Sequence, residues 1–176
     1  MKNQNFAEIG KTILCISLLE EKIKQFYSIV SKLSENEEVK LAFEYLSADS
    51  EIHKDFLRRI AKLLAPSLKF ETIENCEVMV GSKLMEALKK YEDMLNKMEK
   101  RALGKEDITE LIRWHISLSG PEYLMMVNLT AFSFILKRRK GVSQILKAMA
   151  EGRKARIEVQ EQIIRAIGSV KPPHNN

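Results

Sequence analysis

Apolar residues recur along this chain at alternating steps of three and four, the spacing that marks one face of an α-helix. The period first runs over residues 5–33, stops at Ser34, and resumes over residues 36–64. Ser34 and Glu37 have the spacing of a capping box, in which two side chains satisfy the free amides at a helix start. The pattern therefore predicts two helices joined in a tight antiparallel hairpin.

Proline and glycine divide the rest of the chain. Pro66 ends the second predicted helix, and roughly fifteen residues without a period follow it, enough at about 3.3 Å each to run the length of a bundle. Three further helices are predicted, over residues 79–102, 107–137 and 142–168. Gly120-Pro121 interrupts the fourth of them, where we expect a kink or a complete break.

The last predicted helix differs from the others because its apolar face is weak. Arg153 and Gln160 fall between its apolar residues, so we expect this helix to lie on the surface of the bundle. The segment 171–176 contains two prolines and is predicted to be frayed. The predicted fold is an all-α single domain over residues 1–170, an antiparallel four-helix bundle (hairpin, crossover, hairpin) plus a C-terminal fifth helix.

Composition agrees with this fold and narrows the class of protein. The chain has 176 residues, of which 45% are hydrophobic and 30% are charged, with only 7 glycines and 4 prolines. The longest apolar run, residues 13–19, is too short to span a bilayer. Cys15 and Cys76 belong to no CxxC pair, which favours buried thiols in a reducing compartment. We therefore expect a cytoplasmic protein that is not inserted in a membrane.

Several polar residues interrupt the predicted apolar faces midway along their helices. Glu20 takes a core position on the first helix, and Ser50 and His53 do so on the second. His115 and Glu122 do the same on the fourth helix. Because an isolated buried carboxylate costs several kcal/mol, such a group must be paired, protonated or bound to a metal. These positions indicate a polar site inside the bundle.

The spacing of these residues suggests that the site is built from two related hairpins. Glu20 and Ser50 are thirty residues apart and should lie level in the first hairpin. Glu92 and Glu122 are also thirty residues apart and should lie roughly level in a second hairpin. An internal duplication is consistent with this spacing.

Together these fragments resemble the ferritin-like superfamily, rubrerythrin branch, whose di-iron site takes one Glu from each of two helices and a Glu-x-x-His from each of the other two. Glu20 stands in a Glu-x6-Tyr spacing similar to that of a rubrerythrin-like first helix. The second helix has Ser50-x-x-His53, which keeps the histidine but replaces the glutamate. The fourth has Glu122-x-x-Met125, which keeps the glutamate but replaces the histidine.

The resemblance implies a degenerate metal site. Its expected ligands are Glu20, His53, Glu92 and Glu122, and it would hold one iron, manganese or zinc ion or none. At most residual oxidoreductase activity is then expected, and whether the chain is an enzyme stays open. Ferritin-like hairpins also frequently form homodimers along exposed helix faces. A lower-ranked pairing takes the last two helices as the second half, with Glu151 and Lys154 in the Glu-x-x-His positions.

A basic stripe supports a different function. The chain has a net charge of +5, and residues 137–156 hold eight basic side chains against one acid, Glu151. The basic residues are Lys137, Arg138, Arg139, Lys140, Lys147, Arg153, Lys154 and Arg156. A stripe of this kind could contact the phosphates of a nucleic acid or an acidic protein. The alternative hypothesis is therefore a metal-free helical bundle that binds such a partner.

Overall fold

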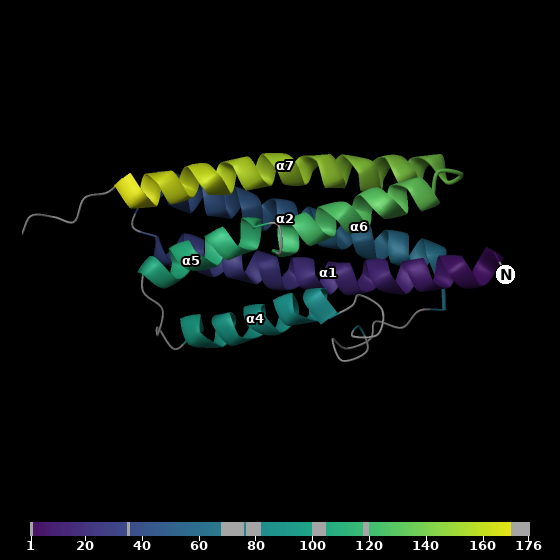
Figure 1. Cartoon of the computed structure of the whole chain (residues 1–176), viewed down its shortest axis with the longest axis horizontal. Helices are drawn as coiled ribbons and strands as arrows, with labels where there is room; N and C mark the ends of the chain where they lie inside the picture. The colour runs from purple at the N-terminus through teal and green to yellow at the C-terminus, as the bar shows by residue number, and fades with distance from the viewer. Residues whose placement is uncertain are drawn as a thin grey trace, which may run out of the picture.

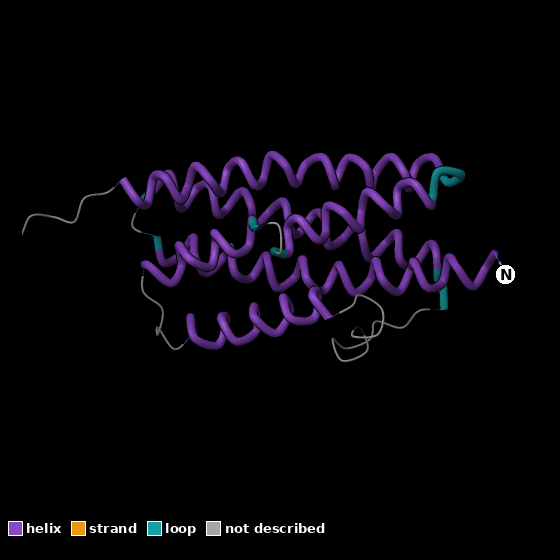
Figure 2. Tube along the Cα trace, viewed as in Figure 1, coloured by secondary structure: helices purple, strands orange, loops and turns teal. Residues whose placement is uncertain are grey.

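The computed structural model describes residues 2–34, 36–67, 76, 82–99, 105–117 and 120–169. Its helices are α1 (Lys2–Leu33), α2 (Glu37–Leu64), α4 (Ser82–Glu99), α5 (Lys105–Ile116), α6 (Pro121–Ile135) and α7 (Lys140–Ser169), shown in Figure 1. Within these described ranges there is no β-strand, as the colouring of Figure 2 shows. The all-α prediction is confirmed. The predicted frayed tail, 171–176, lies outside the described residues.

The first predicted hairpin is confirmed. Helices α1 and α2 pack along each other and bury large side chains such as Ile13, Phe26 and Phe43. The cap of α2 is Asn36 rather than Ser34: its side chain accepts hydrogen bonds from the amides of Glu38 and Val39. An asparagine oxygen performs this role as well as a serine hydroxyl.

A second hairpin is made by α6 and α7, and α7 also packs against α2 and α5. The prediction that the last helix lies on the bundle surface is therefore wrong. Residues buried on α7 follow one another at steps of one, three or four: Leu146, Met149, Ala150, Arg153, Arg156, Gln160 and Ile163. The buried face of α7 thus includes the polar residues that made its apolar pattern look weak. A guanidinium can occupy such a position where carboxylates face it.

Helix α4 occupies a different place from the one predicted for residues 79–102. It packs mainly on α1, with fewer contacts to α6, and Figure 1 shows it on the side of α1 that faces away from α7. In the chain it lies between the end of α2 and the start of α5, so it belongs to the connection between the two hairpins. Most of the predicted crossover segment lies outside the described residues.

The interruption predicted at Gly120-Pro121 is a complete break between α5 and α6. A Cβ atom on Gly120 would lie 2.2 Å from the carbonyl oxygen of Trp114 and 2.5 Å from that of His115, so only glycine fits there. Pro121 then starts α6, where its missing amide costs nothing because the first amides of a helix have no partner within it.

The two cysteines form a disulfide between Cys15 on α1 and Cys76, closing a loop across a sequence separation of 61. The prediction of two buried thiols is wrong, so the inference of a reducing compartment loses the observation on which it rested. Spacing in the sequence could not reveal this pair, because the two residues become neighbours only through the fold. Within the described residues, no helix is long and apolar enough to cross a membrane.

Candidate functional site

Three of the four predicted site residues gather inside the bundle. Glu20 and Glu122 have no exposed surface, and the side chain of His53 is 10% exposed. The Nδ1 atom of His53 lies 3.3 Å from Oε1 of Glu20. Glu92 is not part of this group: its side chain is 40% exposed, and its carboxylate lies 3.4 Å from the ammonium of Lys22.

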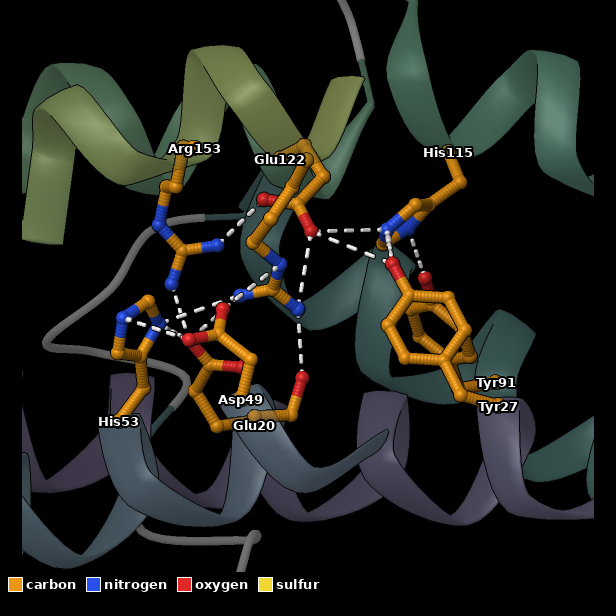
Figure 3. A network of polar contacts seen from close by, with 10 residues as sticks. Glu20, Tyr27, Asp49, His53, Tyr91, His115, Glu122 and Arg153 are labelled. Carbon is orange, nitrogen blue, oxygen red and sulfur yellow. Dashed lines mark hydrogen bonds and ion pairs between the residues drawn. The ribbon is translucent and has the colours of Figure 1, made fainter. Parts of the chain in front are cut away.

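Two arginines from α7, Arg153 and Arg156, lie among these residues, and Figure 3 shows Arg153 beside Glu122. Arg153 donates from Nη1 to Oε2 of Glu122 at 2.5 Å and from Nη2 to Oε1 of Glu20. One guanidinium therefore joins a carboxylate from the first hairpin to one from the second. Arg153 is fully buried, so these charges attract each other with little screening by water.

Arg156 lies one turn further along α7 and contacts the same two carboxylates. Its Nη1 is 3.6 Å from Oε1 of Glu20, and its Nη2 is 3.2 Å from Oε1 of Glu122. The group also contacts three α2 residues. Nη2 donates to the Ser50 hydroxyl at 2.5 Å, Nη1 lies 3.2 Å from Nδ1 of His53, and Nε lies 3.5 Å from Oδ2 of Asp49. We call Glu20, Glu122, Arg153 and Arg156 the arginine–carboxylate cluster.

The Glu122 carboxylate also contacts a buried group of aromatic side chains. Nε2 of His115 lies 3.1 Å from Oε1 of Glu122 and 2.6 Å from the hydroxyl of Tyr27. Nδ1 of His115 lies against the hydroxyl of Tyr91 on α4. Both ring nitrogens of this fully buried histidine are therefore satisfied.

The break between α5 and α6 accounts for the contact between His115 and Glu122. In a continuous helix, seven residues would separate these positions by about 10 Å along the axis. Because the chain turns at Gly120, the end of α5 and the first turn of α6 come to the same level. The first turn of a helix also favours a negative charge, which suits a carboxylate at Glu122.

Charges within the cluster determine the protonation of its acids. Burial alone would raise the pKa of Glu20, but Arg153 and Arg156, with a hydrogen bond from His53, outweigh burial and lower the pKa to about 2. Burial likewise opposes ionisation of Glu122, and the two guanidinium groups lower its pKa well below the ordinary value. Both acids are ionised at neutral pH, so two negative charges face two positive charges.

His115, Tyr27 and Tyr91, which lie beside the cluster, are neutral at pH 7. Burial lowers the pKa of His115, although Glu122 acts in the opposite direction. Burial also raises the pKa of Tyr27 and of Tyr91 well above the ordinary value. The fully buried charges of this interior are therefore two carboxylates and two guanidinium groups, and the partly exposed Asp49 adds a third carboxylate, 3.5 Å from Nε of Arg156.

The donor set does not fit the metal that the ferritin-like resemblance implies. Both oxygens of Glu122 and Oε1 of Glu20 already contact guanidinium nitrogens. Oε2 of Glu20 has no hydrogen-bond partner, but one oxygen is too small a donor set for a divalent ion. Among the described residues, no group of three or more His, Cys, Asp or Glu side chains could hold a metal ion.

Sequence reasoning missed Arg153 and Arg156, although their spacing contained a signal. The two residues stand three apart in Arg-x-x-Arg, as do Ser50 and His53 in Ser-x-x-His on α2. Glu122 and Arg153 are 31 residues apart, against thirty for Glu20 and Ser50. The lower-ranked pairing, in which the last two helices form the second half, thus matches the packing of α6 against α7. The residues that face the site are Arg153 and Arg156, each two positions after the Glu151 and Lys154 of that pairing.

The same finding corrects the basic stripe. Arg153 and Arg156 were predicted as part of an exposed surface, and both are buried because the cluster's carboxylates face them. The remaining basic residues of the stripe are exposed: Lys137, Arg138, Arg139, Lys140, Lys147 and Lys154. Four of them are consecutive at the turn between α6 and α7, and we call Lys137, Arg138, Arg139 and Lys140 the basic turn.

Comparisons with protein-family models, with curated proteins and with solved structures found no match to this chain.

Proposed function

We propose that this chain is a metal-free bundle of ferritin-like architecture that acts through its surface as an interaction protein rather than as an oxidoreductase. The observation that carries the proposal is the pair of buried guanidinium groups between Glu20 and Glu122. In a di-metal bundle, carboxylates at these positions would hold cations supplied from outside. Here α7 supplies two cations from the chain itself.

Charge balance supports this proposal. A buried carboxylate cluster must bind a cation or take up protons. Arg153 and Arg156 meet that need without either, since they neutralise Glu20 and Glu122 one for one. A divalent ion would bring two further positive charges into a neutral interior and would have to displace guanidinium groups from their carboxylates.

Metal titration tests the proposal directly. We expect the melting temperature of the wild-type chain to stay unchanged on adding iron(II), manganese or zinc, and the purified protein to contain none of them by elemental analysis. As a control, Arg153→Ala combined with Arg156→Ala removes both internal cations but keeps Glu20 and Glu122. At about 100 times its dissociation constant, a metal bound by this variant should add roughly 2.7 kcal/mol to the free energy of unfolding.

The opposite result in the wild-type chain would contradict the proposal, whether or not the double variant folds. A comparable gain with any of the three metals, abolished by Glu20→Ala, would show that the guanidinium groups leave when metal arrives. The chain would then be a metal-binding protein of the ferritin-like kind with a reduced ligand set.

A second candidate function is binding of a nucleic acid or another polyanion at the basic turn. Its four consecutive cations are all exposed, and their positive charge adds to the net charge of +5. Arg139 also lies over the ring of Phe6 at 5.1 Å, which fixes part of the turn against α1. A fixed group of cations is a better phosphate site than the same charges on a mobile segment.

Salt dependence of DNA binding tests this second function. Arg138→Glu combined with Arg139→Glu should weaken binding of a short duplex and lower the slope of log K against log salt by about two. The control is Lys89→Glu combined with Lys97→Glu on α4, which changes the net charge equally. Equal loss in both variants, or no binding at about 50 mM salt, would exclude a site at the basic turn.

A further inference from the structure

The outer face of α2 is apolar along most of its length. Five of the ten exposed large hydrophobic residues among the described parts of the chain lie on this one helix. They are Leu41 (67% exposed), Tyr45 (58%), Ile52 (55%), Phe56 (42%) and Leu63 (57%). We call these five residues the α2 stripe.

The spacing of the α2 stripe places its members side by side. They follow one another at steps of four, seven, four and seven residues. With about 3.6 residues per turn, all five fall within about 60° of the helix circumference. Leu41 and Leu63 are about 33 Å apart at 1.5 Å per residue, so the stripe is long and narrow. Large apolar side chains gathered on one exposed face mark a binding site, whereas single exposed hydrophobic residues do not.

Charges along the same exposed face change sign from one end of α2 to the other. Three acids, Glu37, Glu38 and Glu44, are exposed in the first half, and two bases, Arg59 and Lys62, are exposed in the second. One acid, Asp55, is also exposed in the second half. A partner that covers the stripe must therefore present basic groups near its acidic end and acidic groups near its basic end.

A second copy of α2 running in the opposite direction has this charge pattern. With a twofold axis at Ile52, Leu41 of one copy lies level with Leu63 of the other. Glu44 then lies within one turn of Lys62 of the second copy, and both are on the same flank of the stripe because they are eighteen residues, or five turns, apart. A parallel pair would instead place acids level with acids.

We propose that the chain forms an antiparallel homodimer in which the α2 stripes of two copies pack on each other about Ile52. The stripe supplies the apolar centre of the interface, and the Glu44 and Lys62 pairs on its flank set the direction. This interface does not depend on whether the interior binds metal, so the experiments below test it independently of the function proposed above.

Mass measurement by light scattering tests the dimer. At micromolar concentration the wild-type chain should have twice the 20.3 kDa of one chain. Ile52→Lys places two like charges at the centre of the interface and should give a monomer. Phe134→Lys is the matched control, because Phe134 on α6 is 72% exposed but lies outside the stripe, and it should stay dimeric. A monomeric wild type, or a dimer lost only with Phe134→Lys, would overturn the proposal.

Cysteine cross-linking tests the direction. Both native cysteines are in the disulfide, so an introduced cysteine is the single free thiol. Ile52→Cys should cross-link two copies under mild oxidation, since residue 52 meets itself at the twofold axis, whereas Leu41→Cys should not. Cross-linking at residue 41 would overturn the antiparallel pairing. As a charge test, Glu44→Lys should weaken the dimer, and adding Lys62→Glu should restore it.

Discussion

Replacing Arg153 by methionine is expected to lower the free energy of unfolding by roughly 3–5 kcal/mol, as found when one partner of a buried ion pair is removed. Methionine has a similar length and no charge, so the substitution removes the guanidinium without leaving a large cavity. Glu20 and Glu122 would keep Arg156 as their only shared cation, which leaves a surplus negative charge in the interior. Urea denaturation of both proteins at pH 7 measures the difference.

Two further variants separate charge from packing. Adding Glu20→Gln to Arg153→Met removes the surplus charge and should recover part of the loss. Lys154→Met makes the same chemical change at the adjacent, exposed position of α7 and should alter stability by no more than about 0.5 kcal/mol. If Arg153→Met proved as stable as Lys154→Met, the two buried carboxylates would not depend on Arg153, and the account of the cluster given above would be wrong.

The helices were largely predictable because burial of one face imposes a period of three and four on the sequence. That period located α1 and α2, and its polar interruptions correctly marked Glu20, His53 and Glu122 as interior. The break at Gly120 was located by the Gly-Pro pair. Glu92 was misplaced because it only borders its apolar stripe. A border position does not distinguish a ligand from a surface residue, and Glu92 pairs with Lys22.

Arg153 and Arg156 were not predicted to be interior because the apolar pattern of α7 is weak, and a buried face of this kind does not stand out in the sequence. A guanidinium is tolerated there only when carboxylates from other helices face it, and those partners are 133 and 31 residues away for Arg153. The disulfide is a similar case. Contacts between distant segments depend on how the helices pack, and a single sequence contains little information about that packing.

Lowering the pH is expected to decrease the free energy of unfolding in two stages. The first stage is due to His115, and the second to Glu20 and Glu122. His115 has a lowered pKa when folded, so below its ordinary value of 6.5 the unfolded chain takes up a proton that the folded chain does not. Stability should therefore begin to fall below about pH 6.5. This first loss is the smaller one, since Glu122 partly opposes the effect of burial on the histidine.

The larger loss should follow as the pH falls below 4.5, the ordinary pKa of both glutamates. The folded pKa of Glu20 is about 2, so between these two values the unfolded chain binds the proton and the folded chain does not. At 1.36 kcal/mol for each pH unit, Glu20 alone accounts for about 3 kcal/mol, and Glu122 adds to it in the same direction. Urea denaturation at pH 7, 5, 4 and 3 should show this decline, and Glu20→Gln should make it shallower. Stability that instead rises from pH 7 to pH 4 would mean that the folded state takes up protons at these carboxyls, which two neighbouring guanidinium groups should prevent.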